Sequence, residues 1–408
     1  MPGLLAVALG NRRVGTLVNL TGDDNLFSFD PEYADDPNRP VLSQAFIAPS
    51  GALITRVPRT HRAAPAYFAN LLPEEGSVLR SIVARQFQIN PTRDFPFLRG
   101  LGADLPGAIV MASESDSSQD AEQITVQLAA DERPLRFSLA GVQTKFSATF
   151  VQNRLTIPME GIGGSWIVKL PVNAFPRLPE NEFNVTFLAR AIGIEVPETR
   201  LVPLDQIEGL PKDLPALRAD EPRVAYVIRR FDRTAAGRVH GEDFNQIADA
   251  KPDEKYDGKA SHWIANVTQQ LCPSEDVDAV IRRLIFGVCI GNNDMHLKNW
   301  SVLYPDGRNA RLSPLYDYVC TREYYPEGSL ALTIGGERNF EQIDGAALER
   351  FARRAELPVR RTLILADEVV TRLRDAWHQE KAAFAEPFVQ AVERHFATVP
   401  LMAWGRTL

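Results

Sequence analysis

Cysteine is scarce in this chain, which has three among its 408 residues: Cys272, Cys289 and Cys320. Their spacings match neither a zinc-binding pattern nor a disulfide framework, and two of the three stand in apolar surroundings. We therefore expect buried free thiols in a reducing cytosol, and no zinc site.

Long apolar runs are also missing. No stretch approaches the roughly 20 apolar residues that a membrane-spanning helix needs. Residues 1–5 lack the basic flank and the cleavage site of a signal peptide. These absences predict a cytoplasmic protein without a membrane partner.

Basic residues are not in excess. The chain has 45 Lys and Arg against 52 Asp and Glu, a formal net charge of -7 at pH 7. That balance argues against a protein that coats nucleic acid, although it allows a local basic patch. With 45% hydrophobic and 24% charged residues, the chain belongs with soluble globular proteins of two or three domains.

The most informative stretch is 291–299, Gly-Asn-Asn-Asp-Met-His-Leu-Lys-Asn, which follows an apolar helical pattern over residues 277–288. Asp294 precedes Asn299 by five residues, the spacing of a kinase catalytic loop. In such a loop the carboxylate takes the acceptor's proton and the amide oxygen holds magnesium. Eighteen residues on, Asp317 offers a second carboxylate for metal. Alone, an Asp-rich turn after a helix is more often a cap or loop, so this interpretation depends on patterns upstream.

The patterns upstream, over residues 135–193, predict a phosphate-binding region. Residues 135–151 alternate like antiparallel strands around a small-residue turn, whose amides could cover phosphates. Lys169 lies in an apolar strand, where its charge is costly without a partner. Glu182 follows near the start of an amphipathic helix that should stop at Gly193. A strand lysine paired with a helix glutamate positions the α- and β-phosphates in kinases.

Further elements complete the predicted architecture. Strands over 196–202 and 224–228 lead to residues 229–231, where a hinge between lobes would bind adenine through its backbone. We interpret the arginines that cluster there as structural or solvated. A hairpin around residues 10–11 opens the chain, and a polar linker lies at 113–123.

We expect an α+β, two-lobed, protein-kinase-like fold with an extra N-terminal β-containing subdomain and an all-helical C-terminal lobe. The domains expected are an N-terminal subdomain at 1–118, a kinase N-lobe at 119–232 and a helical C-lobe at 233–408.

In their order along nearly the whole chain, these motifs resemble the HipA-type serine/threonine kinases, the toxin halves of bacterial toxin–antitoxin pairs. The stretches that carry the resemblance are 13–15, 68–73, 138–145, 167–171, 180–182, 230–233, 294–299 and 330–336.

The resemblance implies a kinase that uses ATP and Mg2+ and arrests growth by phosphorylating an aminoacyl-tRNA synthetase. It also implies neutralisation by a small helix-turn-helix antitoxin of the HipB type, and contact with operator DNA through the antitoxin complex.

Carried over residue by residue, the resemblance implies that Asp294 is the catalytic base and that Asn299 and Asp317 bind magnesium. It also implies that Glu182 orients Lys169. One departure stands in the hinge, where Arg229 replaces the glutamate expected from the family. The ATP-binding residues that it implies are Ala140, Gly141, Val142, Gln143, Thr144, Lys145, Lys169, Arg229, Arg230, Phe231, His296, Lys298, Asn299, Tyr316 and Asp317.

Ser138 matches the family's autophosphorylated serine. From the sequence alone it is a strand serine that faces solvent, whereas the resemblance favours a switch. A phosphate there would add about −1.5 to −2 charges beside the nucleotide's own phosphates. We expect this repulsion to expel the turn at residues 140–145 from the nucleotide site, so that activity is lost.

Two other interpretations stay open. His296, two residues after Asp294, also fits small-molecule and lipid kinases. A second alternative is a catalytically silent corepressor that binds the antitoxin on operator DNA. The presence of every required catalytic residue type counts against that alternative.

Overall fold

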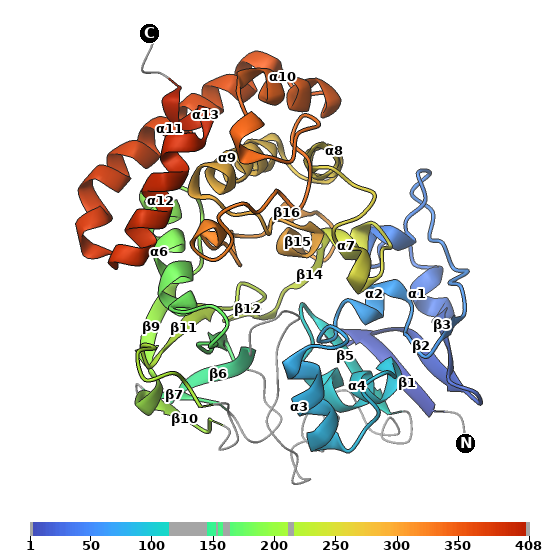
Figure 1. Ribbon diagram of the computed structural model, residues 1–408. Helices are drawn as coiled ribbons and strands as arrows, with labels where there is room; N and C mark the ends of the chain where they lie inside the picture. The colour runs from blue at the N-terminus through green and yellow to red at the C-terminus, as the bar shows by residue number, and fades with distance from the viewer. Residues whose placement is uncertain (1–2, 114–144, 152–153, 158–163, 211–215, 405–408) are drawn as a thin grey trace.

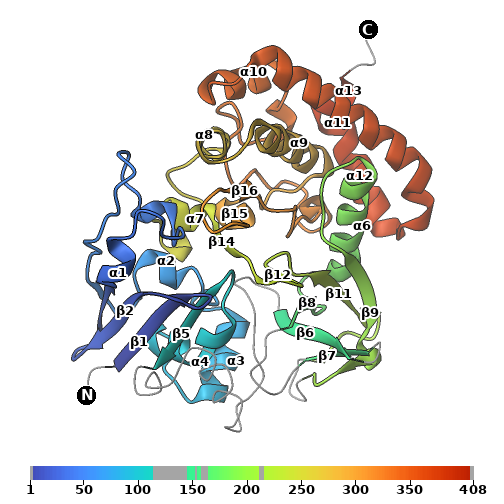
Figure 2. The same ribbon diagram turned by 180° about the vertical axis from the view of Figure 1, so that it is seen from behind.

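The computed structural model describes residues 3–113, 145–151, 154–157, 164–210 and 216–404. Figure 1 shows two sheets side by side, one near the N-terminus and one from the middle of the chain, with a mainly helical region above both. The view from behind shows the same arrangement (Figure 2). We call residues 3–113 the N-terminal unit, the second sheet the central sheet, and residues 233–404 the C-terminal lobe.

The N-terminal unit is built on a five-stranded antiparallel sheet with the order β4-β3-β2-β1-β5. The predicted hairpin is present, and Gly10 takes a positive φ of 56° in its turn. One of the unit's helices ends at Ala69 and the next begins at Val78, with the helix-breaking Pro73 between them. Its elements are β1 (Gly3–Leu9), β2 (Arg12–Leu20), β3 (Asp24–Phe29), α1 (Pro31–Ala34), β4 (Thr60–His61), α2 (Ala66–Ala69), α3 (Val78–Phe87), α4 (Asp94–Leu101) and β5 (Ile109–Ser113).

The central sheet has six strands in the order β10-β7-β6-β8-β11-β9. Its strands are β6 (Lys145–Val151), β7 (Arg154–Thr156), β8 (Trp166–Lys169), β9 (Thr199–Pro203), β10 (Ile207–Glu208) and β11 (Val224–Arg229). Strand β8 is buried on both faces. Val168 packs into one core with the N-terminal unit, whereas Ile167 packs with Tyr226 on the opposite face. Because side chains alternate along a strand, Lys169 shares the face of Ile167.

Helix α6 (Leu178–Ala191) covers that second face and contacts β9 and β11. As predicted, it ends just before Gly193, whose φ of 87° suits the residue after a helix. The helix therefore brings Glu182 over the strand that carries Lys169.

The C-terminal lobe holds the largest apolar core, which contains the predicted stripe on α9 (Ser274–Ile290). The longest helix of the lobe is α11 (Val359–Glu380), whose buried face joins the same core. The remaining helices of the lobe are α7 (Phe244–Ile247), α8 (Ser261–Leu271), α10 (Gly345–Arg354), α12 (Glu386–Thr398) and α13 (Pro400–Ala403).

The expectation that this lobe is all-helical is wrong in one respect. It contains a two-stranded ribbon and a three-stranded antiparallel sheet with the order β14-β15-β16. The strands are short, and β14 and β15 pair across almost sixty residues, with Asp243 opposite Ser301. Strands of four residues with a distant partner leave too little periodicity to recognise. Their bounds are β12 (Arg233–Thr234), β13 (Gly237–Arg238), β14 (His240–Asp243), β15 (Ser301–Tyr304) and β16 (Arg311–Leu312).

All three cysteines are free thiols; Cys289 and Cys320 are buried and Cys272 is partly buried. Among the described helices, none combines the length and the apolar character that crossing a membrane requires.

Candidate active site

The segment that follows α9 is a folded loop whose backbone is fixed by two asparagines. Gly291 ends the helix with a φ of 78°. The Asn292 side chain accepts a hydrogen bond from the Asp294 amide at 3.0 Å. Asn299, in the 3-10 helix Leu297–Asn299, donates its Nδ2 to the Asp294 carbonyl oxygen at 2.7 Å. Asp294 is thus held at both of its backbone polar groups.

Asp317, which lines the same cavity as Asp294, has a left-handed backbone conformation with a φ of 56°. Lys145 and Lys169 face each other across β6 and β8, and both ammonium groups bind this carboxylate. The distance from Lys145 Nζ to Asp317 Oδ2 is 2.8 Å. Burial would raise the pKa of Asp317, but the two lysine charges outweigh it and lower the pKa well below its ordinary value.

Lys169 also pairs with Glu182 on α6, and both side chains are buried. Burial would lower the pKa of Lys169, but Asp317 and Glu182 outweigh that effect and raise it. The lysine therefore stays charged between two carboxylates. The neighbouring Asn181 exchanges hydrogen bonds with the backbone of Cys320, so α6 also anchors the segment that carries Asp317.

These side chains line one cavity of about 1020 Å³. That volume suits a nucleotide-sized ligand. The expected site residues that line it are Lys145, Lys169, Glu182, Arg229, Arg230, Phe231, Asp294, His296, Lys298, Asn299, Tyr316 and Asp317. Residues Ala140 to Thr144 of the expected phosphate loop, and Ser138, lie outside the described residues.

The cavity's side chains fit ATP and a magnesium ion chemically. The Asp317 carboxylate and the Asn299 amide are hard oxygen donors, which magnesium accepts together with phosphate oxygens and water. Because Asn299 Nδ2 is taken by a carbonyl, its amide oxygen is the atom left for a cation. Lys298 is buried, and its ammonium has no hydrogen bond among the described residues, although the Glu74 carboxylate lies 3.6 Å away. A phosphate oxygen would supply that missing acceptor.

Three residues of the 291–299 loop have shifted pKa values. Burial, with the Lys255 and Lys298 charges, lowers the pKa of His296 well below its ordinary value, so the imidazole is neutral. Burial also lowers the pKa of Lys298, although Asp243 and Glu74 act in the opposite direction. Desolvation at the cavity wall raises the pKa of Asp294, whose side chain is 49% exposed.

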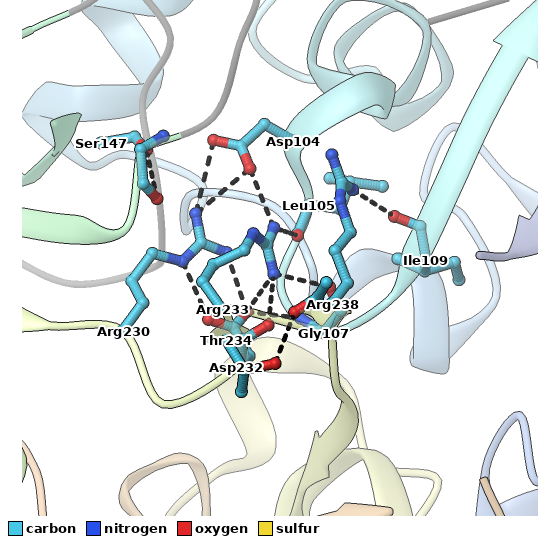
Figure 3. A network of polar contacts seen from close by, with 12 residues as sticks. Asp104, Leu105, Gly107, Ile109, Ser147, Arg230, Asp232, Arg233, Thr234 and Arg238 are labelled. Carbon is cyan, nitrogen blue, oxygen red and sulfur yellow. Dashed lines mark hydrogen bonds and ion pairs between the residues drawn. The ribbon is translucent and has the colours of Figure 1, made fainter. Parts of the chain in front are cut away.

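The side chains of the expected hinge residues, 229–231, point in different directions. The Arg229 side chain is exposed, and the Phe231 ring lies 5.5 Å from that of Tyr316. The Arg230 side chain turns away into a buried network with Asp232 and Asp104 of the N-terminal unit (Figure 3). The side chain of Arg230 is therefore structural, which leaves only its backbone for a nucleotide.

Several residues of the site were not singled out from the sequence. Tyr256 donates a hydrogen bond to Asp294, Glu74 binds Lys255, and Asp104 binds the hinge. The stretch quoted for the resemblance, 68–73, stops one residue before Glu74. The partners of these residues are distant in sequence, so no local pattern marks them.

Two family models together match most of the chain. A model described as the HipA-like C-terminal domain matches residues 137–377, and one described as the HipA N-terminal domain matches residues 5–112. Two relatives in Sinorhizobium fredii carry kinase names, Y4dM and Y4mE. Y4dM is 42% identical over 406 residues, covering 98% of this chain and 97% of Y4dM. Y4mE is 29% identical over 385 residues, covering 86% of each.

Among solved structures, a chain of the Shewanella oneidensis MR-1 toxin–antitoxin complex of HipA, HipB and operator DNA matches with a TM-score of 0.73. The match covers 98% of this chain and 96% of that chain at 20% sequence identity. At that identity the match establishes the fold alone, and it agrees with the predicted two-lobed kinase-like architecture.

Proposed function

The chain belongs to the HipA family, and on that premise we propose that it is an ATP- and magnesium-dependent serine/threonine protein kinase. We further propose that it acts in the cytoplasm as the toxin of a toxin–antitoxin pair. One observation carries the kinase proposal: Lys145, Lys169 and Asp317 form a charged cluster in the cavity that also contains Asp294 and Asn299.

The roles follow from the chemistry of phosphoryl transfer, which needs alignment and charge neutralisation more than covalent help. Lys145 and Lys169 bind phosphate oxygens, and Glu182 keeps Lys169 in place. Asp294 accepts the proton of the acceptor hydroxyl. A magnesium ion held by Asn299 and Asp317 would neutralise developing charge on the phosphates.

The charges around Asp317 are consistent with this assignment. Without nucleotide, the ammonium groups of Lys145 and Lys169 balance two carboxylates, that of Glu182 and that of Asp317, whose side chain is three-quarters buried. With ATP bound, the two lysines would bind phosphate oxygens in place of the Asp317 carboxylate, and this carboxylate would hold the cation. The site thus remains charge-balanced in both states, so the buried lysines are not left unpaired.

The partners we propose follow from the family. The matched Shewanella chain comes from a complex with HipB and operator DNA, and we propose a helix-turn-helix antitoxin of that type for this chain. We propose an aminoacyl-tRNA synthetase as the protein substrate and Ser138 as the site of autophosphorylation.

Transfer of labelled phosphate from γ-labelled ATP tests this function. The purified chain, Asp294→Asn and Asp317→Asn should be incubated with magnesium and ATP, alone and with bacterial protein extract. We expect transfer by the unaltered chain to protein, and a loss of about 100-fold or more in Asp294→Asn with ATP still bound. Unchanged transfer in Asp294→Asn would refute the proposal, as would transfer to a choline, inositol lipid or aminoglycoside acceptor in place of protein.

A further inference from the structure

Tyr256 contacts the proposed base Asp294 directly. The roles proposed above for nucleotide binding do not include this tyrosine. It lies between the 3-10 helix Pro252–Glu254 and α8. Its hydroxyl donates a hydrogen bond to Asp294 Oδ1 at 3.0 Å. The edge of its ring meets the imidazole of His296, with the ring centroids 5.1 Å apart and the planes at 82°.

Within the part of the chain that the structure describes, both polar contacts to the Asp294 side chain fall on the same oxygen. His296 Nε2 lies 3.8 Å from Oδ1, the atom that Tyr256 binds. Asn292 and Asn299 fix only the backbone of Asp294. The hydrogen bond from Tyr256 therefore restricts the rotation of the carboxylate and leaves Oδ2 to accept a proton. General bases are commonly oriented by such a third group.

The tyrosine is in turn fixed from the N-terminal unit. Lys255 Nζ lies 5.2 Å from the centroid of the Tyr256 ring. The same ammonium binds both carboxylate oxygens of Glu74, at 2.8 and 3.0 Å. Glu74 also lies 3.6 Å from the Lys298 ammonium. One carboxylate of the N-terminal unit thus holds two lysines of the C-terminal lobe.

We propose that Tyr256 is a positioning residue for the base Asp294, and that the N-terminal unit holds it in place through Glu74 and Lys255. The inference rests on the proposed kinase function. It gives the N-terminal unit a part in phosphoryl transfer: without Glu74 the loop that carries Tyr256 loses its anchor, and the base loses its orientation.

The test compares kcat and the KM for ATP in isosteric variants of the full chain. Tyr256→Phe removes only the hydroxyl, and Glu74→Gln removes only the charge. Glu75→Gln is the matched control, because it removes the charge of the exposed neighbouring glutamate. Initial rates are measured for each variant over a range of γ-labelled ATP concentrations, and Tyr256→Phe is also made in the Asp294→Asn background.

We expect Tyr256→Phe to lower kcat by about 10- to 100-fold, with the KM for ATP within about twofold of that of the unaltered chain. In the Asp294→Asn background it should have no further effect, because the hydroxyl acts through that carboxylate. Glu74→Gln should lower kcat less than Tyr256→Phe, and its effect should shrink when the two are combined. Glu75→Gln should leave kcat unchanged.

Three outcomes overturn the inference alone while the unaltered chain remains active. They are full or increased activity in Tyr256→Phe, an equal loss from that change in the Asp294→Asn background, and a full effect of Glu74→Gln after the tyrosine hydroxyl has been removed. If the unaltered chain transfers no phosphate at all, the proposed function itself fails, and no base remains to be positioned.

Discussion

Arg230 of the hinge binds Asp104 of the N-terminal unit, with 3.2 Å between Nη1 and Oδ1, and both side chains are 1% exposed. Arg233 binds the same carboxylate at 2.9 Å, and Arg230 also binds both oxygens of Asp232 (Figure 3). Residues 230–233 are therefore tied to the N-terminal unit by buried ion pairs.

The first prediction concerns that tie. Asp104→Asn keeps the shape of the side chain but leaves two buried arginines with less countercharge. We expect a loss of about 3–5 kcal/mol in the free energy of unfolding, measured by denaturant titration. The control is Glu349→Gln, which breaks the exposed Arg353–Glu349 pair and should cost less than about 1 kcal/mol. Equal losses in the two variants would contradict a structural role for the buried network.

The second prediction concerns pH and rests on Glu242. This buried carboxyl on β14 is bound by Ser43 and the Gln44 amide of the N-terminal unit and by Tyr304. Burial raises its pKa to about 7, although those three donors lower it. The folded state therefore holds a proton that the unfolded state has released, so stability falls as the pH rises from about 4 to about 7.

In Glu242→Gln that part of the pH dependence should disappear. Because the amide cannot ionise, we expect its advantage over the unaltered chain to reach about 3 kcal/mol at alkaline pH. Urea titrations across this pH range measure the difference. The exposed Glu75→Gln should preserve the slope of the unaltered chain, and a slope retained in Glu242→Gln would show that another group titrates.

Local patterns account for much of the fold and of the candidate site. A pattern of about a dozen residues is enough to predict each of three elements: the apolar stripe of α9, the helix that carries Glu182 and the strand that carries Lys169. The spacing from Asp294 to Asn299 is equally local. Residue types that are tied to function and stand at short spacings can therefore be recognised in the sequence itself.

Contacts between distant segments could not be predicted in this way. Glu74 and Lys255 are 181 residues apart, and Arg230 and Asp104 are 126 residues apart. The sequence pattern around Glu74 does not distinguish it from Glu75. The two glutamates differ in that Glu74 binds Lys255, which lies far away in the sequence. The three-stranded sheet of the C-terminal lobe was missed for the same reason.

The third prediction separates charge balance from catalysis at Lys169. Lys169→Met leaves Glu182, whose side chain is 1% exposed, without its ammonium partner, and should lose about 3–5 kcal/mol of stability. Lys169→Met combined with Glu182→Gln removes both charges and should recover most of that stability. Phosphate transfer should stay lost in both variants. Thermal unfolding and transfer assays on the same samples decide the matter, and recovered transfer in the double variant would contradict the role of Lys169.

The fourth prediction concerns Ser138, which lies outside the described residues. Incubation with magnesium and ATP should add one phosphate, seen in the intact mass and mapped to the tryptic peptide that contains Ser138. In Ser138→Ala that peptide should carry no phosphate. Phosphate on the same peptide in the variant would place the modification on another residue.

The last prediction uses the backbone of Asp317. Its φ of 56° is tolerated by asparagine more readily than by alanine, so Asp317→Asn removes the charge with little added strain. With one countercharge gone, Lys145 and Lys169 are freer to bind phosphate, and ATP should bind without magnesium at least as tightly as in the unaltered chain. The gain in affinity that magnesium gives should fall, and transfer should drop by about 100-fold or more. Calorimetric titration of ATP with and without magnesium measures both affinities. Asp317→Ala, the strained counterpart, should additionally unfold at a lower temperature. A magnesium effect on ATP affinity that survives in Asp317→Asn would mean that the cation is held elsewhere in the cavity.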